Sequence, residues 1–288
     1  MGQCDQDKCT TRVSSSDIAD AVQVAKMADM VVVSVAVTST EGFDRDNLTL
    51  GGNQDVLIEQ VAAANPNTIV VVRCPGAVLM PWRDKVKAII VQFLPGEQAG
   101  HALAAVLFGD VDPGGRLPVS FPATSSQTWL QSKHQYPGVS NGKGGYIATY
   151  TEELNIGYRW FDAVKQHPAF EFGTGMSYAE FKYENLRISG SEVSFDLKNT
   201  ANITGSEVAQ LYLSFPPSAG EPPLQLKGFR KVTLVAGASR RISLTLTPQD
   251  FSVWDTRDAG WKKLPGNYGV VVGASSRDGR LHGTIIIR

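Results

Sequence analysis

The spacing of hydrophobic residues changes partway along the chain, and one type of β-sheet cannot accommodate both spacings. In the first half, residues 30–37, 68–72 and 88–93 form short, continuous apolar runs rich in Val and Ile. Strands that are buried on both faces of a parallel sheet have this composition. In the second half, apolar and polar residues alternate, as they do over residues 193–197. Alternation of this kind is typical of a strand with one buried face.

Segments of helical periodicity separate the apolar runs of the first half. The first of these segments follows Ser16, which we expect to cap the helix. Two more cover residues 56–64 and 101–108, and Gly109 ends the last one. The order of strands and helices predicts an α/β domain, with a mostly parallel sheet and helices on both faces.

The second half is predicted to be an all-β sandwich, because several short strands are separated by turn residues. The chain has 288 residues, which fits two domains of ordinary size. We therefore expect an α/β domain over residues 1–135 and a β-sandwich over 183–288. Residues 136–182, a Gly-rich loop followed by an aromatic stretch, form a connector between them. The aromatic side chains of the connector are too apolar to remain solvated, and we expect them to pack between the two domains.

Composition excludes several classes of protein. The formal net charge is −1, so the chain lacks the basic excess that a nucleic-acid-binding protein uses to neutralise phosphates. The longest apolar run, residues 30–37, is too short to cross a bilayer. No Gly-rich phosphate fingerprint is present, which argues against a nucleotide-binding protein. The four His are scattered, so we expect no metal site and no cofactor.

The three cysteines leave two interpretations open. Cys4 and Cys9 lie close together in a polar segment, whereas Cys74 ends an apolar run. A Cys4–Cys9 disulfide would suit a secreted protein, but these residues could equally be two surface thiols. Residues 1–9 contain no apolar segment of the kind found in a signal peptide.

The segment after the first buried strand is the first place to look for a binding site. Ligands of open α/β sheets bind beyond the carboxyl ends of the strands. Glu41, Asp44, Arg45 and Asp46 cluster there, and Gly42 lets the backbone approach a ligand closely. A carboxylate in this position can act as a general acid or base, and the guanidinium of Arg45 could hold a neighbouring carboxylate. The spacing alone favours an ordinary solvated loop, because charged loops are common at the ends of strands.

Residues 41–50, which read Glu-Gly-Phe-Asp-Arg-Asp-Asn-Leu-Thr-Leu, resemble a signature of family 3 glycoside hydrolases of the β-glucosidase kind. Further segments resemble the same family in the same order: residues 62–72, 78–82, 94–100, 106–118, 150–162 and 172–178. Residues 207–213, 226–232 and 272–278 are similar to the fibronectin type III-like domain that closes many of these enzymes. The resemblance covers nearly the whole chain and identifies the sandwich as fibronectin type III-like.

The resemblance implies a retaining β-glycosidase, most often one that hydrolyses terminal non-reducing β-D-glucosyl residues. In such enzymes the acid/base Glu lies on the loop that matches Glu41, and we assign that role to Glu41. Asp44 and Arg45 match the same motif, and we expect them to shape the loop or to contact the sugar. The nucleophilic Asp of the family belongs to an N-terminal barrel, and we expect no nucleophile within this chain.

A retaining mechanism needs two carboxylates, so we expect the isolated chain to be inactive or incomplete. The expected partners are a β-linked oligosaccharide or glycoside and a separate or missing N-terminal barrel, with no nucleic acid and no membrane. The family resemblance favours a secreted or extracellular protein. The alternative is a non-catalytic carbohydrate-binding or scaffold protein that is derived from this family.

Overall fold

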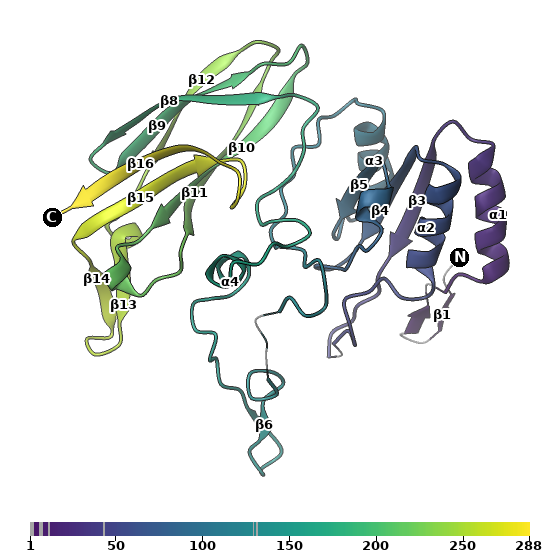
Figure 1. Cartoon of the computed structure of the whole chain (residues 1–288), viewed down its shortest axis with the longest axis horizontal. Helices are drawn as coiled ribbons and strands as arrows, with labels where there is room; N and C mark the ends of the chain where they lie inside the picture. Colours follow the sequence, from purple (N-terminus) through teal and green to yellow (C-terminus); the bar gives the residue numbers. More distant parts are fainter. Residues whose placement is uncertain (1–2, 6–7, 11, 43, 129, 131) are drawn as a thin grey trace. The chain divides into compact units, whose positions relative to one another are not determined.

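The chain folds into two compact units (Figure 1). The computed structural model describes the backbone of residues 3–5, 8–10, 12–42, 44–128, 130 and 132–288, and their side chains from Arg12 onwards. The first unit contains Met1–Ala102 and Phe121–Gln127, and the second contains Leu103–Ser120 and Thr128–Arg288. This division follows packing, and the domain boundaries expected at residues 135 and 182 stay a prediction.

The first unit is built on a parallel sheet in the order β3-β4-β5, which confirms the predicted α/β architecture. These strands are Val31–Ala36, Thr68–Arg73 and Ala88–Gln92. The central strand is the most deeply buried, because Val70, Val71 and Val72 are fully inaccessible to solvent. This explains why its sequence is a continuous β-branched run rather than an alternating one.

Helices precede, connect and follow the strands of this sheet. They are α1 (Ser15–Lys26), α2 (Gln54–Ala64) and α3 (Ala99–Leu107), with a short 3-10 helix, η1, at Arg83–Lys85. The cap of α1 is Ser14, so the expectation of a cap at Ser16 is wrong. The Ser14 side chain accepts a hydrogen bond from the Asp17 amide, and the Asp17 carboxylate accepts one from the Ser14 amide. Such a reciprocal pair satisfies two backbone donors at once and therefore fixes the start of the helix.

Two short hairpins lie outside these layers. Strands β1 (Gln3–Asp5) and β2 (Lys8–Thr10) pair antiparallel with Cys4 opposite Cys9. The side chains of both cysteines lie outside the described part, so their two interpretations stay open. The second hairpin consists of β6 (Val139–Ser140) and β7 (Tyr146–Ile147).

The second unit contains an antiparallel sandwich, as predicted. One sheet has the order β11-β10-β15-β16, the other the order β12-β9-β8, and β13 and β14 form a separate hairpin. The strands are β8 (Phe181–Ser189), β9 (Glu192–Asn199), β10 (Gly205–Ser214), β11 (Gln225–Leu234), β12 (Ser239–Thr245), β13 (Ser252–Asp255), β14 (Gly260–Lys263), β15 (Gly266–Gly273) and β16 (Gly279–Ile287). Two 3-10 helices lie in its loops, η2 (Pro217–Ala219) and η3 (Pro248–Phe251).

The core of the sandwich comes from the alternating positions that the sequence shows. Phe195 of β9, Leu211 of β10 and Val272 of β15 are fully buried members of one hydrophobic cluster. The clear alternation on β9 arises because its other face remains partly open to solvent.

Strand β10 differs from its neighbours because both of its faces are buried. Its inner face carries Ala209, Leu211 and Leu213, and its outer face carries Gln210 and Tyr212, which are also buried. The ring of Tyr158, from the connector helix α4 (Tyr158–Ala163), lies edge-on to that of Tyr212 at 6.1 Å. Tyr158 of the connector therefore packs on the sandwich, and the expectation that the connector aromatics pack between the two domains stays a prediction.

No helix among the described residues is long and apolar enough to span a membrane.

A substitution at Gly173 can test how closely the connector approaches β10. The φ of Gly173 is 81°, and an added Cβ would overlap the side chain of Gln210. We expect Gly173→Ala to lower the free energy of unfolding by more than about 1 kcal/mol, through strain and overlap together. Urea denaturation measures this change. The matched control is Gly190→Ala, where φ is 58° and no atom lies within 4 Å of the added Cβ. An equal loss in both variants would show that overlap contributes nothing.

Candidate functional site

The loop that follows β3 carries the predicted site residues. It leaves the sheet after a last backbone hydrogen bond, in which the Val37 amide donates to the Arg73 carbonyl at 2.9 Å. Glu41, Gly42 and Asp44 are exposed on this loop, while Phe43 of the same motif lies outside the described residues. Gly42 has a φ of 85°, a conformation that favours glycine and turns the chain directly after Glu41.

A hydrogen bond of Arg45 connects this loop to the loop that follows β4. The guanidinium Nη2 donates to the Ala77 carbonyl at 2.9 Å, and the side chain is half-buried. Among the described residues it forms no ion pair with Glu41, Asp44 or Asp46. The hypothesis that Arg45 holds a neighbouring carboxylate is therefore wrong. Because its hydrogen bond goes to the backbone, Arg45 shapes the loop and leaves the carboxylates free to face solvent.

The far end of the loop has further supports. The Leu79 amide donates to the Leu48 carbonyl at 2.8 Å, which joins the two loops a second time. The Asn47 Oδ1 accepts from the amide of Thr49 at 2.9 Å and from its hydroxyl at 2.6 Å. A side chain that bonds to the backbone two residues later forms a compact turn, so this end of the loop is locally ordered.

Gln54 is the residue that sequence reasoning missed. It is buried, and its Nε2 donates at 3.0 Å both to the Ala36 carbonyl, where the loop begins, and to the Leu50 carbonyl, where it ends. Its Oε1 accepts from the Ala36 amide at 3.0 Å. One amide side chain thus holds both ends of the loop. The available signal is its place in the first turn of α2, directly after the charged segment.

Two ionisable groups under this loop are shifted by burial. Cys74 is buried, and loss of solvation raises the pKa of its thiol, which disfavours the reactive thiolate. Burial also raises the pKa of Asp55, although the Trp82 indole donates it a hydrogen bond of 2.8 Å that acts in the opposite direction. Both groups therefore belong to the packed interior, and Glu41, Asp44 and Asp46 are the exposed carboxylates of the loop.

Chemically, the loop can offer a carboxylate that takes up and releases protons. Among the described residues, no group of three or more His, Cys, Asp or Glu side chains is arranged to hold a metal ion. The structure thus places Glu41, Asp44 and Arg45 on one anchored loop at the carboxyl end of a parallel strand, which is where α/β folds bind ligands.

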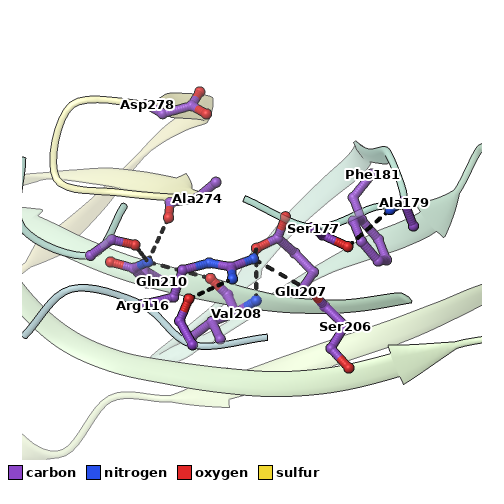
Figure 2. A network of polar contacts seen from close by, with 12 residues as sticks. Arg116, Ser177, Ala179, Phe181, Ser206, Glu207, Val208, Gln210, Ala274 and Asp278 are labelled. Carbon is purple, nitrogen blue, oxygen red and sulfur yellow. Dashed lines mark hydrogen bonds and ion pairs between the residues drawn. The ribbon is translucent and has the colours of Figure 1, made fainter. Parts of the chain in front are cut away.

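A second polar cluster lies in the other unit, around β10 (Figure 2). Arg116 and Glu207 form a 2.8 Å ion pair with side chains only 8% and 7% exposed. The Nε2 of Gln210 donates to the carbonyls of Gly173 at 3.0 Å and Ala274 at 2.6 Å, while the Tyr212 hydroxyl donates to its Oε1. The contacts of Arg116, Gly173 and Ala274 join covering segments and a loop to β10, and the Tyr212–Gln210 hydrogen bond lies within the strand, so we assign the cluster to structure.

Comparison with known families identifies both parts of the chain. Residues 6–178 match the Glycosyl hydrolase family 3 C-terminal domain. Residues 207–276 match the Fibronectin type III-like domain.

The curated relatives include several beta-glucosidases. The chain is 36% identical over 277 residues to a beta-glucosidase of Rhizobium radiobacter, which covers 92% of this chain and 34% of that protein. It is 35% identical over 273 residues to thermostable beta-glucosidase B of Acetivibrio thermocellus, covering 91% of this chain and 35% of that protein. The chain therefore spans about a third of the length of these relatives.

Solved structures agree with this relationship. A beta-glucosidase from Streptomyces venezuelae in complex with D-glucose superposes with a TM-score of 0.91 at 38% identity, over 95% of this chain and 35% of that one. Beta-glucosidase 3B from Thermotoga neapolitana, also in complex with glucose, gives a TM-score of 0.83 at 30% identity, over 95% and 39% of the two chains.

The two ends of the loop depend on Gln54, and this dependence can be tested. Gln54→Leu keeps the volume but leaves buried groups of Ala36 and Leu50 unpaired, which costs about 1–3 kcal/mol of stability. We expect faster hydrogen–deuterium exchange of the amides in residues 37–50, measured by mass spectrometry. Gln60→Leu is the control, since Gln60 is exposed on the same helix. Unchanged exchange in Gln54→Leu would contradict the role of this side chain.

The buried ion pair of the second unit predicts a non-additive result. Glu207→Leu leaves the Arg116 guanidinium buried without its partner, and we expect a loss of about 3–5 kcal/mol in the free energy of unfolding. The double variant Arg116→Met with Glu207→Leu removes both charges and should lose less than either single variant. A double-mutant cycle by urea denaturation measures the coupling, and additive losses would show that the two charges act independently.

Proposed function

The chain belongs to glycosyl hydrolase family 3 and is homologous to its beta-glucosidases over their C-terminal part, and we propose that it supplies the acid/base carboxylate, Glu41, of a retaining β-glucosidase. The observation that carries this proposal is the position of Glu41. It is an exposed carboxylate at the carboxyl end of β3, on a loop anchored by Arg45 and Gln54. The substrate class is a glycoside with a terminal non-reducing β-D-glucosyl residue.

In the proposed reaction Glu41 acts twice. Its carboxylic acid first donates a proton to the glycosidic oxygen as the bond to the sugar breaks, while a second carboxylate forms a covalent bond to the anomeric carbon. The resulting Glu41 carboxylate then takes a proton from a water molecule, whose oxygen attacks the anomeric carbon and releases the sugar. Glu41 thereby regains its proton and the nucleophile is freed.

The surroundings of Glu41 support a site that is completed from elsewhere. The two carboxylates of a retaining enzyme are about 5 Å apart, and a general acid needs a surface that shields it from water. Glu41 is exposed, and its nearest acidic neighbour in the sequence, Asp44, is exposed on the same loop. We therefore place the nucleophile and the shielding surface in a part of the enzyme that these 288 residues do not include, which accords with a match of about a third of the relatives' length.

Asp44 and Arg45 take different parts in this proposal. Arg45 is a positioning residue, because the Nη2 of its guanidinium donates a hydrogen bond to the Ala77 carbonyl. Asp44 is exposed two residues beyond Gly42 and forms no ion pair among the described residues, so its carboxylate is available to accept hydrogen bonds from sugar hydroxyls. Neither residue exchanges a proton in the reaction.

Hydrolysis of p-nitrophenyl β-D-glucoside tests the role of Glu41. We would assay the chain alone, and also the chain mixed with the part of the Rhizobium radiobacter beta-glucosidase that it does not span. We expect turnover only in the mixture, and a loss of about a hundredfold or more in Glu41→Gln. Azide, a nucleophile that needs no general base, should restore part of the second step. The matched control is Glu192→Gln, an exposed carboxylate on β9.

The outcomes separate the candidates. Turnover of the mixture that is unchanged in Glu41→Gln would overturn the assignment of Glu41. Glucose binding by calorimetry without turnover in the mixture would favour the alternative, a non-catalytic carbohydrate-binding protein of the same family.

A further inference from the structure

A groove at one edge of the sandwich gathers four basic residues. It has a volume of about 570 Å³ and lies where β11 of one sheet meets β12 of the other. Its lining consists of Arg230, Lys231, Val232, Arg240, Arg241, Ile242 and Ser243. Four of these seven residues are basic, and none is acidic or aromatic.

The charges in this groove are mostly uncompensated. Arg241 forms a 2.9 Å ion pair with Asp196 of β9, and Asp196 also accepts a hydrogen bond from Asn185. Within the described part of the chain, Arg230, Lys231 and Arg240 form no ion pair. All three are exposed, but the ammonium of Lys231 lies beside Gly114, so the guanidinium groups of Arg230 and Arg240 are the two free cations at this concave surface.

Protection of the sheet edges does not account for this arrangement. Charged side chains on an edge strand discourage pairing with another chain. At the opposite edges of the two sheets, formed by β8 and β16, the cations Lys182 and Arg280 carry carboxylate partners, whereas Arg187 of β8 forms no ion pair among the described residues. Lys182 pairs with Glu184 at 2.6 Å, and Arg280 pairs with Asp278 at 2.7 Å. Unpaired like charges that crowd one groove repel one another, and a bound anion removes that repulsion.

We propose that the β11–β12 groove binds a saccharide chain that carries carboxylate groups, such as a run of uronic acid residues. Arg230 and Arg240 can each present a planar fork that matches the two oxygens of a carboxylate. The two arginines lie on different strands, which suits a ligand with repeated charges. The preference for negative charge rests on the groove alone, whereas the choice of a saccharide rests on the proposed function.

Nucleic acid fits the groove less well. Proteins that bind single strands combine cations with aromatic rings on which bases stack, and the lining of this groove has no such ring. The chain as a whole has a net charge of −1, so long-range attraction of a phosphate backbone is absent.

Calorimetric titration with a galacturonic acid oligosaccharide tests the proposal. We expect the charge-reversed double variant Arg230→Glu with Arg240→Glu to weaken binding roughly tenfold or more. The matched control, Lys262→Glu with Lys263→Glu, makes the same change of net charge on exposed residues of β14 and should leave binding unchanged. Arg230→Lys with Arg240→Lys keeps the charge but loses the forks, so we expect an intermediate loss without the risk that charge reversal disturbs folding. Thermal unfolding of each variant confirms that it is folded.

Three results would overturn the proposal: no binding of the oligosaccharide to the unaltered chain, equal weakening in the groove and control variants, or equal binding of a single-stranded DNA with the same number of charges. A neutral cello-oligosaccharide should not bind to the groove. Because the titration involves no hydrolysis, failure of the groove and failure of Glu41 as a catalytic residue give separate results.

Discussion

A backbone amide or carbonyl cannot be buried without a hydrogen-bond partner, and both units of this protein meet that constraint with a buried glutamine. Gln54 pairs with the backbone at the two points where the site loop leaves and rejoins the packed structure. Gln210 does the same where the connector and the end of β15 meet the outer face of β10. An unpaired group in either place would cost as much as many apolar contacts contribute. The irregular segments of the fold are therefore ordered by specific side chains rather than by the sheets alone.

The carboxylate of Glu41 is exposed and yet well positioned, because the loop that carries it is anchored to the rest of the first unit. Glu41 faces solvent, yet the segment around it is held by Arg45, by the Leu48–Leu79 backbone hydrogen bond and by Gln54. All of these supports come from the first unit itself. The conformational entropy of the loop is thus lost when this unit folds, and it need not be lost again when substrate binds.

The periodicity of the sequence predicted the layers of the fold well, because hydrophobic burial determines them. The parallel strands read as continuous runs, and the sandwich strands read as alternating ones. Residue-level contacts were less predictable. The start of the first helix had a local signal that was overlooked, because Asp17 stands three residues after Ser14 and can complete a capping box, whereas Ala19 stands three residues after Ser16. The partner of Arg45 is a carbonyl 32 residues away, and a backbone carbonyl has no signature in sequence. Glu207 could have been noticed as a charge in a buried strand, but its partner, Arg116, is 91 residues distant.

The double burial of β10 has a consequence for anyone who divides this protein for recombination or crystallisation. A fragment that begins at the first sandwich strand would contain every strand of both sheets. It would nevertheless lose the contacts of Tyr158 with Tyr212 and of Gly173 with Gln210, and it would leave Glu207 without Arg116. The part of the chain that must be transferred together is therefore larger than the two sheets of the sandwich. Shuffling between relatives should move the sandwich together with the segments that carry Arg116, Tyr158 and Gly173, as one folding unit with a discontinuous sequence.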